Sequence, residues 1–270
     1  MNTTAGENVA IIGLGYVGQA YLKVFPKAIT YDPFLPSCSQ ISREIVNDCK
    51  LAIICVSTPS LEEDGSCDTS IVEEVVRWLE TPLILIKSTV RPGTTVRLKE
   101  KYEKRICFSP EYVGEGGYHV SSKYLHPTDV LQHPFMIIGG DQKDRADILD
   151  FFIPIFGPEK FYQQVGATTA ELIKYMENSW IAMKVAFCNE FFEIAQRFGV
   201  DYNELREGWL LDPRVERSHT AVFRDNRGFN TKCIPKDVLA IAAASRDEGY
   251  VPKLIEEVLR SNDEFRKQTK

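Results

Sequence analysis

A glycine-rich hexapeptide directly after a short apolar run constrains the fold of this chain more than any other feature. The apolar run is Val9–Ile12, and the hexapeptide GLGYVG follows it at residues 13–18. Gly13 permits a tight turn, Gly15 lets a phosphate approach the backbone, and Gly18 lets the following helix pack closely on the strand. The hexapeptide therefore predicts a strand, turn and helix that bind a dinucleotide.

An acidic residue stands where a second strand is expected to end. Asp32 follows the apolar run Ala28–Tyr31 and comes 19 residues after Gly13. A carboxylate at this place can bind both ribose hydroxyls and repels a 2′-phosphate, which favours NAD over NADP. A Rossmann-like domain with an empty site is the alternative. The predicted NAD site takes in Gly13, Gly15, Tyr16, Val17, Gly18 and Asp32.

Short apolar runs alternate with helical stretches over the first part of the chain. Runs of this kind, bounded by turn residues, are typical of strands that are buried on both faces. With helices expected at Ser70–Leu79 and Lys143–Phe156, they predict an α/β fold with a Rossmann-type, doubly wound, mostly parallel sheet. The runs are Val9–Ile12, Ala28–Tyr31, Leu51–Val56, Leu83–Ile86, Ile106–Phe108, Phe135–Ile138 and Phe161–Val165.

The pattern changes after Gly166. Residues 167–199 contain no proline and no internal glycine, which predicts one long helix that stops at Gly199. We therefore expect a Rossmann domain over residues 1–166 and an all-α domain, built on the long helix, over residues 167–270. Shorter helices are expected at Tyr202–Leu211, Pro235–Ser245 and Pro252–Phe265.

Composition and charge exclude several classes of function. The formal net charge of −6 argues against binding to nucleic acid or to an anionic membrane surface. No apolar stretch is long enough to span a bilayer, and residues 1–7 lack the features of a signal peptide. Seven cysteines without a C-x-x-C pair favour a reducing cytoplasm and no metal. We expect His119, His126 and His133 to be surface residues.

One cysteine lies in a setting that suits a nucleophile. Lys232 precedes Cys233, Lys236 follows it three residues later, and Pro235 suits the first turn of a helix. Positive charge and a helix N-terminus both favour a thiolate. The alternative, common for an isolated cysteine, is a small buried side chain. A nucleophilic thiol together with a nicotinamide indicates oxidation of an alcohol or aldehyde through a covalent adduct.

Polar residues follow several of the predicted strands. In doubly wound sheets the carboxyl ends of the strands line the ligand crevice, so we expect Thr58 and Thr89 near cofactor or substrate. Glu111 and Glu115 follow another strand and are four residues apart. Carboxylates at such a place can accept protons.

One face of the long helix carries three further candidates. Glu171, Lys174 and Asn178 follow i, i+3, i+7 spacing and therefore share a face. A charged face that is merely solvated is the alternative. Lys174 offers a fixed charge and Asn178 a neutral donor.

Eight segments in a fixed order resemble the UDP-glucose/GDP-mannose dehydrogenase family. The resemblance runs from about Val9 to Asp237. It implies NAD-dependent oxidation of the C6 alcohol of a nucleotide sugar to a carboxylate, with UDP-glucose as the favoured substrate. It also implies a homodimer formed through the 167–199 helix. The segments are GLGYVG, VSTP, KSTVRPGTT, SPEYVGEG, ELIKYMEN, FCNE, DPR and CIPKD.

The resemblance implies a role for each candidate residue. Cys233 would form a thiohemiacetal with the aldehyde and then a thioester, while Lys174 and Asn178 would stabilise the oxyanion. Asp237 and Thr89 would remove a proton through a water, and Glu115 or Glu111 would aid thioester hydrolysis. The cofactor would be contacted by Thr58, Thr89, Glu115 and Lys236. The substrate would be contacted by Glu111, and by Arg214 across a dimer interface.

The chain departs from the family pattern in two places. Asn230-Thr231-Lys232 stand where the family usually has two glycines and a small residue, so side chains would crowd the sugar. The family continues into another α/β domain that binds the nucleotide half of the substrate, whereas this sequence ends at Lys270 after the central-domain helices. Two alternatives stay open: a two-electron hydroxy-acid dehydrogenase that uses Lys174 and Asn178, and a non-catalytic NAD-binding remnant.

Overall fold

The computed structural model describes residues 6–113 and 129–268, and the chain divides into two compact units. The first unit contains the sheet and continues to Lys174. The second unit begins at Tyr175, inside the long helix, and also includes the loop Ser60–Ser66. This loop therefore leaves the first unit and returns to it.

The first unit is built on a seven-stranded sheet with the order β2-β1-β3-β4-β5-β6-β7. Strands β1 to β5 pair in parallel, whereas β6 pairs antiparallel with β5 and parallel with β7. The predicted mostly parallel Rossmann-type sheet is confirmed. The strands are β1 Val9–Ile12, β2 Ile29–Tyr31, β3 Leu51–Ile54, β4 Leu83–Ile86, β5 Ile106–Phe108, β6 Phe135–Gly139 and β7 Phe161–Val165.

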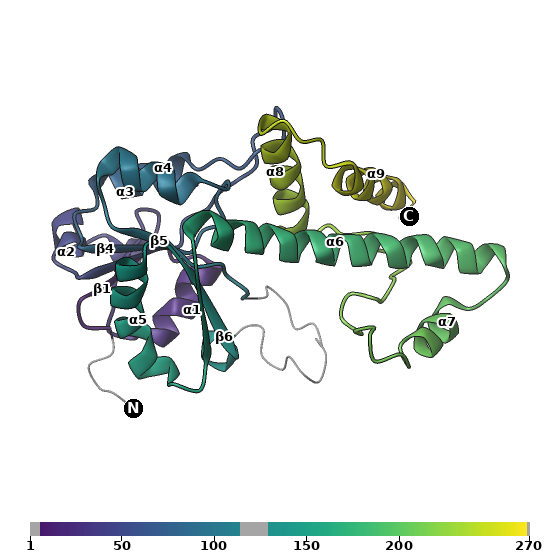
Figure 1. Cartoon of the computed structure of the whole chain (residues 1–270), viewed down its shortest axis with the longest axis horizontal. Coiled ribbons are helices and arrows are strands. Elements are labelled where there is room, and N and C mark those ends of the chain that lie inside the picture. Colours follow the sequence, from purple (N-terminus) through teal and green to yellow (C-terminus); the bar gives the residue numbers. More distant parts are fainter. Residues whose placement is uncertain (1–5, 114–128, 269–270) are drawn as a thin grey trace. The chain divides into compact units, whose positions relative to one another are not determined.

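Helices cover both faces of this sheet. In β1, Val9 and Ile11 join an apolar cluster with α1 and α5, whereas Ala10 and Ile12 join a second cluster with α3 and α4. Figure 1 shows these two helical layers on opposite sides of the strands. Burial on both faces explains the unbroken apolar runs. The helices are α1 Tyr16–Val24, α2 Arg43–Asn47, α3 Ser70–Trp78, α4 Thr94–Tyr102 and α5 Gln142–Phe156, with 3₁₀ turns η1 Pro36–Cys38 and η2 Val130–Gln132.

The long helix α6 spans Ala167–Arg197, which confirms the predicted single helix. Gly199 ends it with a φ of +69°. The Gly199 N–H donates to the carbonyl of Gln196 at 3.1 Å, and the Val200 N–H donates to the carbonyl of Ala195 at 2.9 Å. This arrangement satisfies the last carbonyls of the helix and favours glycine. Among the described residues, no helix combines the length and the apolar character that a membrane crossing needs.

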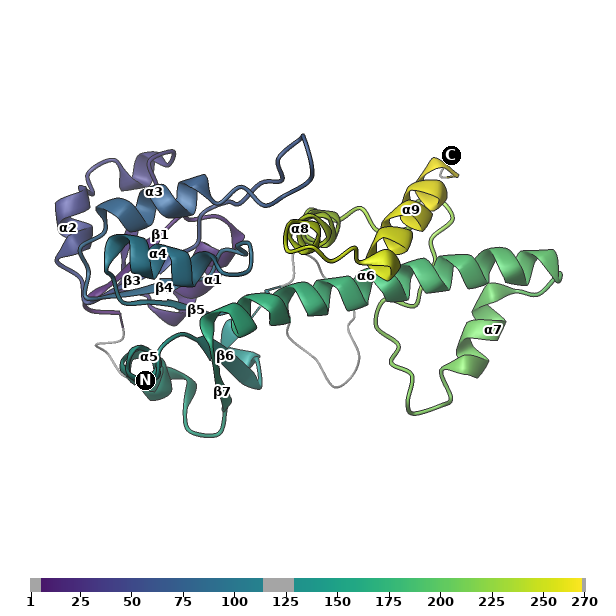
Figure 2. The ribbon, with the colours of Figure 1, turned by 45° about the horizontal axis from the view of Figure 1, so that its top comes forward.

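Three further helices complete the second unit. Figure 2 shows α8 and α9 beside the middle of α6, and α7 beside its C-terminal end. Tyr202 of α7 packs on α6 in a separate, smaller cluster. The main core is formed by α6, α8, α9 and the segment before α8, through Ala182, Ala186, Phe229, Val238, Val258 and Phe265. The helices are α7 Tyr202–Trp209, α8 Ile234–Asp247 and α9 Lys253–Lys267.

Candidate active site

The glycine-rich turn has two positions that only glycine can fill. Gly13 has a φ of +87°, and a Cβ there would lie 2.8 Å from the carbonyl oxygen of Cys55. A Cβ on Gly18 would lie 2.0 Å from the carbonyl oxygen of Gly13. Backbone atoms occupy both spaces and cannot move aside as a flexible side chain could. The turn therefore depends on these glycines for its conformation.

Gly15 lies in a different setting, because a Cβ built there meets no heavy atom within 4 Å. Gly15 is also the N-cap of α1, and Tyr16 and Val17 are the first residues of that helix. Backbone N–H groups at a helix N-terminus attract phosphate groups. The space beside the Gly15 backbone is therefore open, as the pyrophosphate of a bound dinucleotide requires.

Asp32 connects the end of β2 to the same turn. Its carboxylate accepts a hydrogen bond from the Leu14 N–H at 2.9 Å and another from the Phe34 N–H at 3.0 Å. The side chain is half-buried. These two bonds hold the carboxylate beside the glycine-rich turn, as a ribose-binding acid requires.

Thr58 and Thr89 lie at the carboxyl edge of the sheet. The strand order reverses between β1 and β3, and doubly wound sheets bind ligands at such a point. Thr58 follows β3 and is buried, whereas Thr89 follows β4 and is half-buried. The Cys67 thiol donates to the Thr89 carbonyl at 3.4 Å. Contact of either threonine with a ligand stays a prediction.

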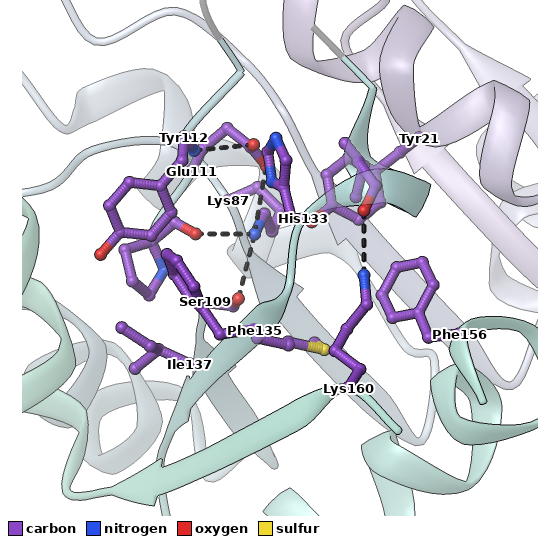
Figure 3. A pocket seen from close by; sticks show the side chains of 13 residues that line it. Tyr21, Lys87, Ser109, Glu111, Tyr112, His133, Phe135, Ile137, Phe156 and Lys160 are labelled. Atoms are coloured by element: carbon purple, nitrogen blue, oxygen red, sulfur yellow. Dashed lines mark hydrogen bonds and ion pairs between the residues drawn. The ribbon is translucent and has the colours of Figure 1, made fainter. Parts of the chain in front are cut away.

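A buried ion pair, not expected from the sequence, lies at the same edge. Lys87 Nζ is 3.2 Å from Glu111 Oε2, and the side chains are 2% and 9% exposed. Lys87 Nζ also donates to Ser109 Oγ and to the Pro110 carbonyl, both at 3.0 Å. Figure 3 shows these groups converging on the ammonium. Glu111, a predicted site residue, is therefore paired with a cation.

His133 lies in this buried region, so its predicted surface position is wrong. The residue is 6% exposed and lines the same pocket as Lys87 and Glu111. The residues around it have the composition of a loop, and only the fold reveals that His133 lies in the interior. His119, His126 and the predicted site residue Glu115 lie outside the described residues.

The candidates on one face of α6 have different partners. Glu171 is 1% exposed and accepts hydrogen bonds from the N–H groups of Gly93 at 2.6 Å and Thr95 at 2.8 Å. The alternative of a solvated charged face is therefore wrong for Glu171. Lys174 is half-buried, and its Nζ lies 5.2 Å from the centre of the Tyr112 ring.

Glu171 anchors the N-terminus of α4, and its removal is expected to destabilise the protein. Glu171→Ala leaves the N–H groups of Gly93 and Thr95 and the Thr95 hydroxyl without their acceptor. We expect the free energy of unfolding to fall by about 3 kcal/mol. Chemical denaturation measures this loss, with Glu177→Ala, an exposed position on the same helix, as the control. Equal stability of the two variants would contradict the anchoring role.

Cys233 is exposed, whereas the other six cysteines are buried. The alternative of a buried side chain is therefore wrong for this residue. Cys233 directly precedes α8, whose second residue is Pro235, as the sequence predicts. The Ile234 N–H donates to Thr231 Oγ1 at 3.4 Å. A helix N-terminus next to the sulfur favours the thiolate.

Asp237 lies one turn into α8 and is 1% exposed. Its N–H donates to the Cys233 carbonyl at 2.9 Å. Asn178 Nδ2 donates to Asp237 Oδ2 at 2.5 Å, and Lys236 Nζ lies 2.6 Å from Asp237 Oδ1. The second unit thus brings together four predicted site residues. Their roles, and the expected place of Lys236 near the cofactor, stay predictions.

Asn262 in α9 was not among the predicted residues, yet it holds the segment before Cys233. It accepts a hydrogen bond from the Phe229 N–H at 2.7 Å and donates one to the Phe229 carbonyl at 3.1 Å. A Cβ on Gly228 would lie 2.3 Å from Asn262 Oδ1, so the position needs glycine. No local pattern could reveal Asn262, because its partner is distant in sequence.

Arg214 lies on the surface of the second unit. Its side chain is 88% exposed and forms a two-pronged ion pair with Asp212. Contact with a substrate across a dimer interface stays a prediction. Within residues 6–113 and 129–268, no cluster of His, Cys, Asp and Glu could hold a metal ion.

The sequence matches two models of one protein family. The UDP-glucose/GDP-mannose dehydrogenase NAD binding domain matches residues 35–152, and the central domain of the same family matches residues 168–264. Together the two matches cover well over half of the chain. The chain belongs to the UDP-glucose/GDP-mannose dehydrogenase family. The resemblance inferred from its motifs is thereby confirmed.

Curated members of this family are similar over most of the chain. A UDP-glucose 6-dehydrogenase of Rickettsia bellii is 32% identical over 253 residues, which are 90% of this chain and 55% of that protein. The UDP-glucose 6-dehydrogenase AglM of Haloferax volcanii is 32% identical over 239 residues, 80% of this chain and 53% of that protein. The chain thus spans about half the length of the curated relatives it matches.

Solved structures share the fold. A UDP-glucose dehydrogenase from Pyrobaculum islandicum matches with a TM-score of 0.78 and 25% identity, over 95% of this chain and 68% of that one. The 3-hydroxyisobutyrate dehydrogenase of Mycobacterium tuberculosis matches with a TM-score of 0.67 and 16% identity, over 97% of this chain and 94% of that one. The second likeness concerns the fold alone.

Proposed function

We propose that this chain catalyses the NAD-dependent oxidation of the C6 alcohol of a nucleotide sugar to a carboxylate. The observation that carries the proposal is the exposed thiol of Cys233 at the N-terminus of α8, one turn from the Asn178–Asp237 pair, in a member of this family. A sulfur nucleophile can hold an aldehyde covalently while it is oxidised further.

The chain carries the family's NAD binding domain, and the glycine-rich turn fits that cofactor. Gly15 would receive the pyrophosphate and Asp32 the ribose, with Thr58, Thr89 and Lys236 as further contacts. When bound, NAD accepts the hydride that each oxidation releases.

The thiol chemistry balances over two oxidations. In the first, the C6 alcohol loses a hydride and a proton and becomes an aldehyde. The Cys233 thiolate then adds to the aldehyde carbon, and the oxyanion takes up a proton to give a thiohemiacetal. In the second oxidation the thiohemiacetal loses a hydride and a proton and becomes a thioester. Water cleaves its C–S bond, which releases the carboxylate and restores the thiol.

The residues around these steps have distinct tasks. Lys174 and Asn178 donate to the C6 oxyanion, and such a donor contributes about 3–4 kcal/mol to the transition state. Asp237 and Thr89, through a water, assist proton removal in the alcohol step. Glu111 or Glu115 aids the hydrolysis of the thioester. Support for the role of Asn178 comes from its bond to Asp237, which orients the amide.

The names of the curated relatives specify UDP-glucose, and we therefore propose UDP-glucose as the substrate. Arg214 has an exposed guanidinium that suits an anionic group of such a substrate. We place the protein in the cytoplasm, because seven cysteines and no disulfide suit a reducing compartment.

We further propose a homodimer through α6. Large apolar side chains stay exposed along α6 in the second unit, and their spacing places them on one face. Trp180→Glu is expected to give a monomer, measured by light scattering, whereas Leu254→Glu, which changes an exposed leucine of α9, leaves the dimer intact. A wild-type monomer would refute the proposal. The exposed residues are Met176, Trp180, Phe187, Phe191 and Ile194 of α6, together with Phe198 directly after its end.

The number of NADH molecules formed per sugar tests the catalytic proposal. Two NADH per UDP-glucose consumed, with a sugar carboxylate as product, is the expected result. One NADH from a small hydroxy acid would support the two-electron alternative. Protection against heat by NAD without any turnover would support a non-catalytic remnant.

A further inference from the structure

The Lys87 ammonium is buried against the segment that carries Glu111. Lys87 follows β4, and its Nζ contacts three successive residues of the segment after β5: Ser109 Oγ and the Pro110 carbonyl at 3.0 Å, and Glu111 Oε2 at 3.2 Å. One cation thereby ties two neighbouring strand ends together at the carboxyl edge of the sheet (Figure 3).

The two oxygens of Glu111 have different surroundings. Oε1 accepts hydrogen bonds from the N–H groups of Tyr112 at 2.8 Å and Val113 at 2.9 Å. Oε2 faces Lys87 and makes no hydrogen bond within the described part of the chain. The adjoining cavity of about 20 Å³ is large enough for one water molecule. Backbone N–H groups therefore fix one oxygen, and the other is directed at the Lys87 ammonium.

Burial and charge oppose each other at this carboxylate. Burial is the largest influence and disfavours ionisation, but the Lys87 ammonium, the Tyr112 N–H and His133 outweigh it, and the pKa of Glu111 lies below its ordinary value. Burial likewise lowers the pKa of Lys87. Among the residues that the structure describes, the other titratable groups that face the pair are Tyr21 in α1, Cys55 after β3, Lys174 in α6 and Lys160, which has Asp129 as a neighbour.

We propose that Lys87 is a positioning residue that keeps Glu111 ionised and oriented, so that Oε2 can accept the proton of a water molecule. The proposal rests on the proposed function, in which Glu111 aids hydrolysis of the thioester. In that step a water oxygen bonds to the thioester carbon and one of the two water protons passes to Glu111. The C–S bond then breaks, the second proton leaves to solvent, and the carboxylate and the Cys233 thiolate are released.

A comparison of stability against pH tests the proposal without any need for activity. In the wild type the pKa of Glu111 is lowered, so its stabilisation is present above the unfolded value of about 4.3 and is lost as pH falls below it. In Lys87→Met, burial is the dominant remaining influence and raises the pKa. The stabilisation by Glu111 is then present only at low pH and is lost as pH rises.

Glu111→Gln isolates this effect in both backgrounds. The stability difference between the wild type and Glu111→Gln should grow from pH 4 to pH 7, whereas the difference between Lys87→Met and the double variant should shrink over the same range. Lys104→Met is the control, because it removes a lysine that donates to backbone carbonyls at the end of α3. In this background the stability difference caused by Glu111→Gln should grow with pH as it does in the wild type. If the stability difference caused by Glu111→Gln changes with pH in the same direction in the wild type and in Lys87→Met, the proposal is overturned.

The kinetics of thioester hydrolysis supply a second readout. In Lys87→Met we expect acyl-enzyme to accumulate at neutral pH, detected by intact mass, and the pH midpoint of hydrolysis to move upward by at least one unit. Lys87→Arg, which keeps the charge, should restore most of the rate. An unchanged pH midpoint in Lys87→Met would overturn the catalytic part of the inference.

The two readouts separate the failure of this inference from the failure of the proposed function. A wild type that forms no NADH from any nucleotide sugar rejects the proposed function, and the stability slopes still decide the role of Lys87. If Lys87→Met does not fold, recovery of folding in the double variant supports the coupling of Lys87 to Glu111. If neither variant folds, the stability difference between the wild type and Glu111→Gln decides alone. A difference that does not change with pH rejects the inference.

Discussion

Cys233→Ser is expected to abolish formation of the sugar carboxylate, with a rate loss of at least roughly 10³-fold, because the covalent adduct depends on the sulfur. The first oxidation needs no thiol, so at most one NADH per sugar should form and aldehyde should be trapped by hydroxylamine. NAD binding should persist, because the glycine-rich turn belongs to the other unit. The NADH yield and the identified product measure the effect.

The distribution of the cysteines provides the control. Cys233 is exposed and the other six are buried, so brief alkylation of the native protein should modify Cys233 selectively. Cys38→Ser changes a buried cysteine and should leave the yield at two NADH per sugar. Carboxylate formation by Cys233→Ser at the wild-type rate would reject the thiol mechanism.

Gly15→Ala and Gly18→Ala are expected to separate cofactor binding from folding. Gly18→Ala places a Cβ 2.0 Å from the Gly13 carbonyl oxygen, so the backbone must shift, at a cost of about 1–3 kcal/mol of stability. Gly15→Ala meets no protein atom and has a φ of −67°, which alanine adopts freely, so stability should hardly change. The methyl group instead occupies the space that the pyrophosphate needs, and NAD affinity should fall by about 10- to 100-fold.

Thermal denaturation with and without NAD measures both effects. Wild type should gain about 2.7 kcal/mol at a concentration of NAD 100 times its dissociation constant, whereas Gly15→Ala should gain far less. Gly208→Ala in α7, where a Cβ also meets no atom, is the control for the added methyl group. Full NAD stabilisation of Gly15→Ala would contradict the assignment of the turn.

Most of the secondary structure could be predicted because its signals are local. The strands β1, β4, β5 and β7 have the residue bounds that the sequence predicts. In β1, β4 and β5 every residue is buried, which explains their unbroken apolar runs, whereas the edge strand β7 is largely exposed. The long helix ends beside Gly199 because only glycine adopts the left-handed conformation there without strain. The reversal of β6 was not predicted in detail, because strand direction depends on the path of the connecting segment.

The candidate site was predicted in part. Cys233, Asp237 and Pro235 carry their signal within five residues of sequence, and the start of α8 agrees with it. Lys87 and Asn262 escaped prediction because their partners are distant in sequence. His133 was misplaced for a related reason, since its environment is made by other strands.

The amino-acid sequence alone determined the class of fold, the family and the order of the candidate site residues along the chain, because periodicity and short motifs are properties of neighbouring residues. The tertiary structure alone decided which charges are buried together. Lys87 meets Glu111, Glu171 caps α4 and Asn262 holds Phe229 only when separate segments are packed. The cost of burying a polar group depends on partners that no local pattern specifies, and only the folded chain supplies them.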